Sequence, residues 1–462
     1  MSEGSKVNVA ELIERQKLGR FTIGLIVASW LVTFFDGYDM TVISFTSKYL
    51  SKDLHLTPLM LGNVFSIGIF GTLLGGLAFG YLGDRIGRRP TILISTGAFS
   101  LLTGCTALAH SYPQLLALRL LNGIALGGAI PLVWALAIEY APKRFRARVV
   151  TLIMLGYGFG VSFCGPLARL LIPHFGWQGV FWFGGGASLA ATLLLMVFLP
   201  ESLRFLTNKG APPQRIARVL ARMAPAFVLP PNPRFIVADE AASTKAFRPS
   251  MLFQGELRLI TPLIWVAFIF SSLSTYFLTT WGPLVLEKLG FSADHAAWLA
   301  AANSLCGAVG GLSIMGFTDR KGAISIAVLP AVAVPLLLTA GLAPMGLGVF
   351  LVLSLCLSLF LGGGHYAIQS IAGAFYPSSV RANGSGWAGS IAKIGSICGP
   401  LIGGAVLSSS LPVKNTYALL AVCPAVFGVC VLMIGLIDRR MRRAAVVVPP
   451  TSELRRSPVA AE

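Results

Sequence analysis

Long apolar runs constrain the fold of this chain more than any other feature. Each run can cross about 30 Å of hydrocarbon as a helix of roughly 20 residues. A membrane β-barrel would instead show alternating segments of about ten residues, and we find none. We therefore expect an all-α polytopic membrane protein with twelve transmembrane helices, near 21–42, 58–81, 91–110, 113–138, 149–172, 177–199, 259–286, 293–317, 323–341, 346–373, 382–410 and 414–437.

The distribution of charge predicts the orientation in the membrane. The formal net charge is +18, which in a soluble protein would suggest nucleic-acid binding. Here most Lys and Arg residues lie in the two tails and in alternate loops, on the side of the N-terminus. Positive loops remain in the cytoplasm, so we expect both termini inside a bacterial inner membrane, near anionic lipid. We expect no nucleic-acid partner.

The cysteines and the N-terminus add little. The seven cysteines lie in apolar runs, and no pair has metal-ligand spacing with histidine. We expect them to be small buried side chains, and we expect no metal and no cofactor. The first 20 residues are polar, and the first apolar run is longer than the core of a signal peptide. The first helix is therefore expected to be an uncleaved anchor.

The two halves of the chain repeat one another. Short motifs recur at an offset of 234 or 235 residues: GDRIG at 83–87 and TDRKG at 318–322, CGPL at 164–167 and 398–401, and Gly-Gly at 127–128 and 362–363. A duplicated six-helix unit follows, giving two pseudo-symmetric bundles with a substrate between them. The predicted regions are an N-terminal tail, a first bundle, a central loop, a second bundle and a C-terminal tail, at 1–20, 21–199, 200–258, 259–437 and 438–462.

Two acids lie inside the first apolar run, in Asp-Gly-Tyr-Asp at 36–39. Each costs about 2.5 kcal/mol or more if it faces lipid. Asp36 and Asp39 are three residues apart and share one helix face, and Gly37 allows a backbone or a ligand to come close. Two such carboxylates resist joint ionisation, so one should hold a proton near neutral pH, as proton coupling requires. A Na⁺ site and a structural acid pair are the alternatives.

Other polar side chains in the apolar runs predict a substrate site. Arg119 could pair with an acid of the first helix or with an anionic substrate. Lys393, about 11 residues into its predicted helix, is too deep to reach the interface easily. Cations from both halves suit a carboxylate. Four further residues could hold an aromatic ring through stacking and polar contacts: His365, Gln369, Tyr276 and Trp281. The alternatives are that His365 is simply packed in the core and that Tyr276 and Trp281 belong to an aromatic belt at the membrane interface.

Charged loop residues predict a latch between the halves. An acid among guanidinium groups at a helix end can favour one arrangement of the two bundles over another by a few kcal/mol. The alternative is that these charges serve only the membrane orientation. The candidates are Asp84 with Arg85, Arg88 and Arg89, then Glu139, and in the second half Asp319 and Arg320.

The chain also resembles a known superfamily. Three stretches are similar to motifs of the major facilitator superfamily: GYLGDRIGRRP at 80–90, RLLNGIALGGAIP at 119–131 and PESLRFL at 200–206. The motif DGYD, together with YFLTTWGP and YPSSVRANGSGWA at 376–388, resembles the aromatic acid:proton symporters, which import benzoate-type carboxylates such as 4-hydroxybenzoate and protocatechuate. The resemblance implies functional roles for Asp36, Asp39, Asp84, Arg119, Glu139, Asp319 and Arg381. Lys393 departs from the family, which usually has Arg there.

We therefore expect a secondary active transporter that imports an aromatic carboxylate of the hydroxybenzoate, protocatechuate or lignin-derived type, with H⁺ as the coupling ion. We expect it to work as a monomer surrounded by lipid. A carrier of another organic anion, a sugar or a drug is the alternative, followed by a membrane protein that transports nothing. The loops contain no nucleophile–base pair or metal cluster, so an enzyme is not expected.

Overall fold

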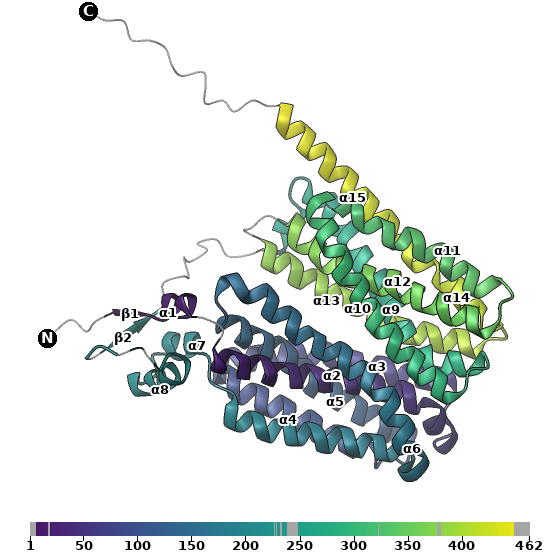
Figure 1. Ribbon diagram of the computed structural model, residues 1–462, viewed down its shortest axis with the longest axis horizontal. Helices are drawn as coiled ribbons and strands as arrows, with labels where there is room; N and C mark the ends of the chain where they lie inside the picture. Colours follow the sequence, from purple (N-terminus) through teal and green to yellow (C-terminus); the bar gives the residue numbers. More distant parts are fainter. Residues whose placement is uncertain are drawn as a thin grey trace, which may run out of the picture.

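The computed structural model describes residues 6–16, 19–225, 227, 229–231, 233–237, 248–321, 323–376 and 380–447. Long helices make up two bundles that lie side by side (Figure 1). The first bundle contains α2 (Arg20–Asp53), α3 (Pro58–Ile86), α4 (Arg88–Thr106), α5 (Tyr112–Glu139) and α6 (Arg146–Phe198). The second contains α9 (Leu257–Lys288), α10 (Ala293–Lys321), α11 (Val328–Leu342), α12 (Leu347–Phe375), α13 (Arg381–Ser408), α14 (Asn415–Leu420) and α15 (Val422–Val447).

Nine segments in the described part of the chain are long and apolar enough to cross a membrane. One of them contains α6, which has 53 residues and is interrupted at Gly176, where φ is +64°. Glycine adopts this conformation without the cost that a side chain would add, so α6 turns there and holds two spans. The more polar α4, with 19 residues, and α10, with 29, have the length of spans as well. With two spans in α6 and one each in α4 and α10, the nine segments become twelve spans, which is consistent with the prediction.

The helices repeat at a constant offset. Adding 235 to the bounds of α3, 58 and 86, gives the bounds of α10, 293 and 321. Adding 235 to the starts of α5 and α6, 112 and 146, gives the starts of α12 and α13, 347 and 381. The duplication predicted from short motifs is therefore present in the helices themselves.

Close contacts between helices repeat at the same offset. A Cβ atom at Gly75 would overlap the carbonyl oxygen of Ile124, and one at Gly310 would overlap that of Leu359. Glycines at such points let two backbones approach, which is how helices associate in lipid. The pair formed by Gly160 and Phe34 likewise corresponds to the pair formed by Gly395 and Ile269, which joins α13 to α9.

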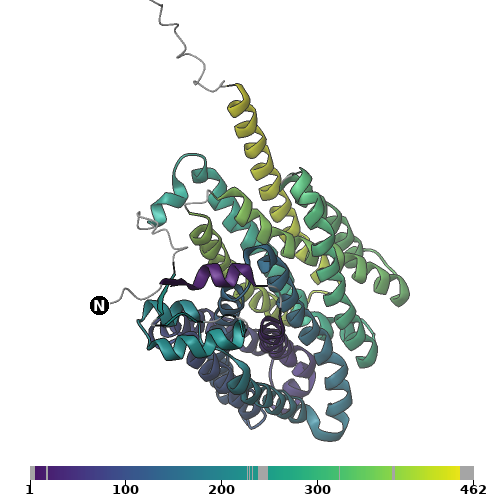
Figure 2. The same ribbon diagram turned by 60° about the vertical axis from the view of Figure 1, so that its left-hand side comes forward.

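A small cap covers one end of the first bundle (Figures 1 and 2). It contains β1 (Lys6–Asn8), α1 (Val9–Arg15), α7 (Leu203–Asn208), α8 (Pro213–Met223) and β2 (Arg234–Ile236), and β1 pairs with β2 in parallel. Val9, Ile13, Ile216 and Leu220 are buried in one cluster with side chains of the first bundle. The N-terminal tail and the central loop, which we predicted only as hydrophilic segments, thus pack on each other.

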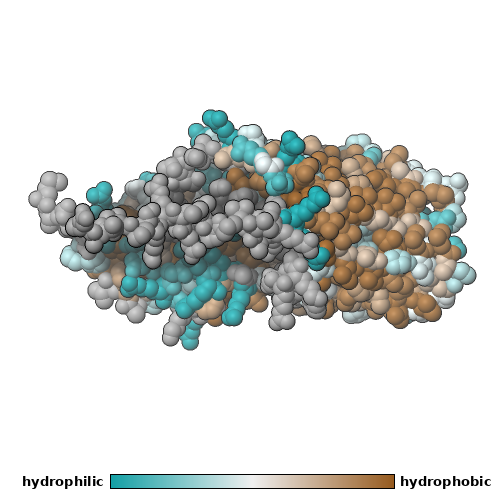
Figure 3. Space-filling model, turned by 90° about the horizontal axis from the view of Figure 1, so that it is seen from above, coloured by the Kyte–Doolittle hydropathy of each residue, from teal (hydrophilic) through white to brown (hydrophobic). Residues whose placement is uncertain are grey.

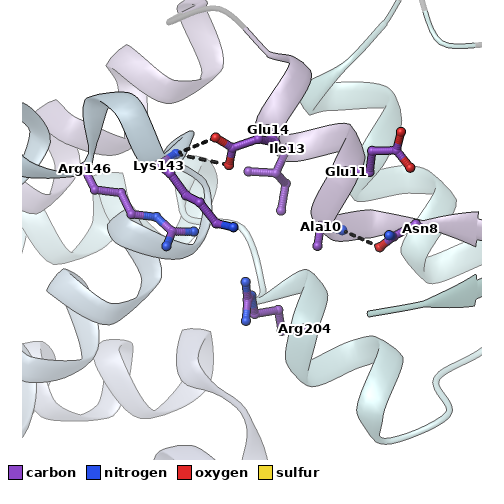
Figure 4. Close-up of a pocket in the computed structure, with 8 residues that line it drawn as sticks. All are labelled: Asn8, Ala10, Glu11, Ile13, Glu14, Lys143, Arg146 and Arg204. Carbon is purple, nitrogen blue, oxygen red and sulfur yellow. Dashed lines mark hydrogen bonds between the residues drawn. The ribbon is translucent and has the colours of Figure 1, made fainter. Parts of the chain in front are cut away.

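The remaining short helices are η1 (Lys143–Phe145), η2 (Pro249–Phe253) and η3 (Ala323–Ala327). Glu14 of α1 accepts hydrogen bonds from the backbone N–H of Lys143 at 3.1 Å to each carboxylate oxygen, beside a cavity of about 220 Å³ (Figure 4). This contact ties the cap to the connection between α5 and α6.

The surface divides into a hydrophilic end and an apolar band. Hydrophilic side chains gather at the end that carries the cap, and hydrophobic side chains cover the body of the bundles (Figure 3). Many large apolar side chains are exposed on the outer faces, among them Leu121, Val197, Leu342 and Val422. Lipid is the solvent that such a surface fits.

Candidate functional site

A cavity of about 740 Å³ lies between the two halves. Its volume is in the range of pockets that hold small organic molecules. Residues of α2, α3, α5 and α6 line one side, and residues of α9, α10, α12 and α13 line the other. The side chains with polar or aromatic chemistry include Asp36, Thr72, Trp134, Tyr157, Thr275, Tyr276, Asn303, Ser354, His365, Tyr366 and Lys393.

The cavity is closed at the end remote from the cap. There Lys48 of α2 pairs with Glu287 of α9 at 2.7 Å, and Arg169 of α6 pairs with Asp294 of α10. Both ion pairs join the two halves. In the described residues, the two ion pairs at the cap end, Arg88 with Glu139 and Arg15 with Glu11, do not join the halves. The cavity lining also includes residues nearer the cap, such as Trp134 of α5 and Gly386 of α13, and the ion pairs between the halves in the described residues lie at the other end, so we take the opening to face the cap.

Asp39 lies in a sealed polar cluster. Its carboxylate pairs with Nη1 of Arg119 at 3.1 Å and accepts hydrogen bonds from Asn122 at 3.0 Å and Thr103 at 2.7 Å. Asp39 is 1% exposed and Arg119 is 5% exposed. Arg119 thus pairs with an acid of the first helix, which is one of its two predicted roles. Arg119 is not among the residues that line the cavity, so its other predicted role, in binding the substrate, stays a prediction.

Asp36 has a different environment, although it is only one turn away. Three residues correspond to about 300° around a helix, so the two carboxylates point about 60° apart. Asp36 lines the cavity, and Lys393 and Asp39 are its charged neighbours. Within the described residues its carboxylate accepts no hydrogen bond. The pair predicted to act together is therefore divided into one sealed acid and one acid at the cavity.

Gly37, between the two acids, has a packing role. A Cβ atom there would overlap the carbonyl oxygen of Tyr157 on α6. The glycine lets the backbones of α2 and α6 meet directly, as predicted for this position. The same contact brings the Tyr157 side chain to the cavity wall beside Asp36.

Lys393 brings a cation to the cavity from the second half. Its Nζ donates a hydrogen bond to Oγ1 of Thr72 on α3 at 3.2 Å, so the side chain reaches across to the first half. Lys393 and Asp36 are the two side chains with a formal charge at neutral pH that line the cavity in the described residues. A cation held by one neutral hydroxyl can exchange that contact for a stronger one with an anion.

The other residues predicted to bind the substrate differ in whether they line the cavity. His365 and Tyr276 line the cavity, and Nδ1 of His365 lies 3.1 Å from Oγ of Ser271, the residue 235 positions after Asp36. The side chain of Gln369 lies outside the described residues. Trp281 is fully buried, and its Nε1–H donates to the carbonyl of Pro400 at 3.0 Å. Trp281 therefore neither lines the cavity nor belongs to an interfacial belt, because it packs in the core.

Of the two acids predicted for the first-half latch, Glu139 and not Asp84 pairs with a loop arginine. Arg88 pairs with Glu139 at 2.7 Å, and the backbone N–H groups of Arg88 and Arg89 donate to Glu201 at 2.9 and 3.2 Å. Asp84 is exposed and makes no ion pair within the described residues. The latch role of Asp84 therefore stays a prediction, whereas Glu201, in PESL at 200–203, is an acid beside the arginines that we missed.

The remaining latch candidates have separate environments. Arg85 lies over the Tyr81 ring, 5.7 Å from its centroid. The side chains of Asp319 and Arg320 lie outside the described residues.

Arg381 donates from Nε to the carbonyl of Tyr376 at 3.2 Å. In the first half Arg146 makes the same bond to Ala141 at 3.2 Å, 235 positions earlier in both members. We read this repeated bond as a structural one that fixes the start of the following helix.

Comparisons with known proteins agree with this architecture. The family profile of the Major Facilitator Superfamily matches residues 29–345 and 263–460. A gallate transporter of Pseudomonas putida is 32% identical over 445 residues, which are 96% of this chain and 98% of the relative. The 4-hydroxybenzoate transporter PcaK of Acinetobacter baylyi is 30% identical and covers 94% of this chain and 96% of its own.

Solved structures show the same fold. The xylose transporter XylE from E. coli has a TM-score of 0.66 and 17% identity, covering 94% of this chain and 99% of its own. A bacterial homolog of the human lysosomal transporter Spinster has a TM-score of 0.68 and 17% identity, covering 92% and 98%. With a duplicated helical fold, a cavity between the halves and a profile match along nearly the whole chain, this protein belongs to the major facilitator superfamily of membrane transporters.

Proposed function

We propose that the protein carries an aromatic carboxylate into the cytoplasm together with a proton. The observation that carries this proposal is the placement of Asp36 and Lys393, one from each half, on the wall of one cavity that also has aromatic walls. The relatives named for gallate and 4-hydroxybenzoate support the choice of substrate class.

The cavity offers separate places for the two parts of such a substrate. The carboxylate binds at Lys393 and replaces its hydrogen bond to Thr72. The ring packs against Tyr157, Tyr276 and Trp134, which contribute apolar surface and polar edges from both halves. Lys presents a point charge rather than the planar fork of Arg, so it accepts the carboxylate in more than one orientation.

Charge balance couples the proton to the anion. When the cavity is empty, ionised Asp36 balances Lys393. When the anion is bound at Lys393, protonated Asp36 keeps the cavity neutral. A cavity that holds only the proton or only the anion has a net charge, and enclosing an unpaired charge away from water is costly. The cavity can therefore close when it is empty or when it holds both the anion and the proton, and each cycle moves one of each.

The remaining charged pairs serve the conformational cycle. The pair of Asp39 and Arg119 stays neutral throughout and stabilises the packing of α2 against α5. The ion pairs Lys48–Glu287 and Arg169 with Asp294 hold the far end shut and must open for the substrate to enter. We place both termini in the cytoplasm of a bacterium, on the side to which the cavity opens, and we expect a lipid-embedded monomer.

Uptake of labelled acids tests the proposal. Cells that express the protein should concentrate 4-hydroxybenzoate, gallate or benzoate, and a protonophore should abolish the accumulation. Xylose and a neutral drug serve as control solutes from the alternative substrate classes. Accumulation that persists after collapse of the proton gradient would remove the coupling, and accumulation of the controls alone would remove the substrate class.

A further inference from the structure

We infer that Asn303, held in place by Ser354, recognises a hydroxyl group on the ring of the substrate. The inference rests on the proposed function, because it names the residue that distinguishes one aromatic acid from another. It assigns a specificity role to the second half that is separate from the binding of the carboxylate.

The geometry of Asn303 leaves one bonding position open. Asn303 lies on α10 and lines the cavity, and its Nδ2 donates to Oγ of Ser354 on α12 at 2.9 Å. Ser354 lines the cavity too and is 6% exposed. Oδ1 of Asn303 is enclosed and accepts no hydrogen bond. The amide is thus held through its nitrogen, and its oxygen has no partner within the protein and is enclosed in this state. The oxygen is inferred to meet a donor from the substrate when the halves rearrange around it.

Two other residues on the cavity wall, one from each half, have the same property. Oγ1 of Thr275 on α9 and Nε1 of Trp134 on α5 are enclosed and have no hydrogen-bond partner. Enclosed polar groups without partners destabilise a protein, and ordinary cores avoid them. Their presence around one cavity indicates a site that is completed by a polar ligand.

The repeat shows why this polar group suits a hydroxyl rather than a carboxylate. Subtracting 235 from Asn303 and Ser354 gives Gly68 and Arg119, and the counterpart of Asp39 is Ser274. In the first half this place holds the sealed ion pair of Arg119 with Asp39. In the second half it holds neutral side chains, of which Asn303 and Ser354 line the cavity. A neutral acceptor favours an uncharged donor and repels a carboxylate, which is left to Lys393.

The expected discrimination follows from the bonding. A phenolic O–H donates to Oδ1 of Asn303 when the cavity closes, whereas benzoate leaves this oxygen unpaired. Sites that hydrogen-bond a substrate hydroxyl discriminate against analogues that lack it. For a single neutral bond we expect a preference of about tenfold in transport efficiency.

Paired substrates test the inference. We would measure transport efficiency for 3- and 4-hydroxybenzoate and for benzoate in the wild type, Asn303→Leu and Ser354→Ala. Asn303→Leu should lose about tenfold for whichever hydroxybenzoate the wild type prefers and should keep benzoate transport within about twofold. Ser354→Ala should shift the ratio in the same direction, because the amide is no longer fixed.

The matched control is Asn63→Leu. Asn63 lies on α3, donates to the hydroxyl of Tyr112 at 3.1 Å and does not line the cavity. The ratio of hydroxybenzoate to benzoate transport efficiency should therefore stay that of the wild type. If Asn303→Leu is absent from the membrane, the ratio in Ser354→Ala decides. An unchanged ratio in these variants, with wild-type uptake intact, overturns the inference alone. Failure of the wild type to concentrate any aromatic acid overturns the proposed function.

Discussion

Replacing Asp39 by Asn should destabilise the protein more than the same change at Asp36. Asn keeps the size of the side chain and can still bond Thr103, but it leaves the guanidinium of Arg119 without a counter-charge. Arg119 is 5% exposed, so water does not screen the remaining charge. Asp36→Asn removes a carboxylate that lines a cavity and accepts no hydrogen bond from the described residues.

The magnitude follows from the burial of the pair. Removing one partner of a buried ion pair costs about 3–5 kcal/mol, whereas removing both is often close to neutral. A loss of 3 kcal/mol corresponds to a fall of about 6 °C or more in the melting temperature of a bundle of this size. Asp39→Asn should therefore melt well below the wild type, and Asp36→Asn should melt within about 2 °C of it.

The assay is thermal unfolding of the purified protein in detergent, followed by tryptophan fluorescence. The double variant Asp39→Leu with Arg119→Leu should recover much of the loss, because no charge is left buried alone. Equal melting temperatures for Asp39→Asn and the wild type would refute the assignment of Asp39 to a sealed structural pair. So would a double variant less stable than the sum of its two single changes.

Three other substitutions give distinct outcomes. Gly37→Val should abolish folded protein in the membrane, as judged by detergent size exclusion, because its side chain would overlap the carbonyl of Tyr157. Trp281→Phe should lose a buried hydrogen bond and about 1 kcal/mol of stability on thermal unfolding while leaving KM unchanged, since the ring does not line the cavity. Lys48→Ala should raise the reactivity of a cysteine placed at Ala300, which lines the cavity, by about twofold to fivefold toward a thiol reagent, because an exposed ion pair contributes up to about 1 kcal/mol; unchanged reactivity would count against a gate there.

Most of the fold could be predicted from the sequence. The apolar runs locate the spans, since a membrane helix must bury its own backbone groups and expose apolar side chains. The offset of 235 residues can be found in short sequence motifs as well as in the helix bounds, because both halves need the same glycines where the same helices cross. The pairing of Gly75 with Ile124, and of Gly310 with Leu359, gives the physical reason.

The division of labour between Asp36 and Asp39 could not be predicted. Spacing places both on one helix face, but their environments depend on the rotation of α2 against α5 and α9. That rotation is set by packing at Gly37 and Gly160, which involves residues far away in the chain. Trp281 illustrates the same limit, because an aromatic side chain in a polar stretch reads as a binding residue until its packing partners are known.

The cap and Glu201 were missed for a related reason. Three residues in each strand are too few for a periodic pattern, and β1 pairs with a strand more than 220 positions away. Glu201 belongs to a stretch that reads as the end of a helix. Its carboxylate accepts bonds from the backbone of Arg88 and Arg89 at the start of α4, so its role depends on tertiary contact.

The most direct test of the coupling is to compare exchange with net uptake in Asp36→Asn. Without the carboxylate, the loaded cavity stays neutral and the empty one has the unbalanced charge of Lys393. The variant, reconstituted in vesicles, should exchange labelled for unlabelled aromatic acid at a rate near that of the wild type. It should fail to accumulate the acid when a proton gradient is imposed. Accumulation by Asp36→Asn equal to that of the wild type would contradict the assignment of the proton to Asp36.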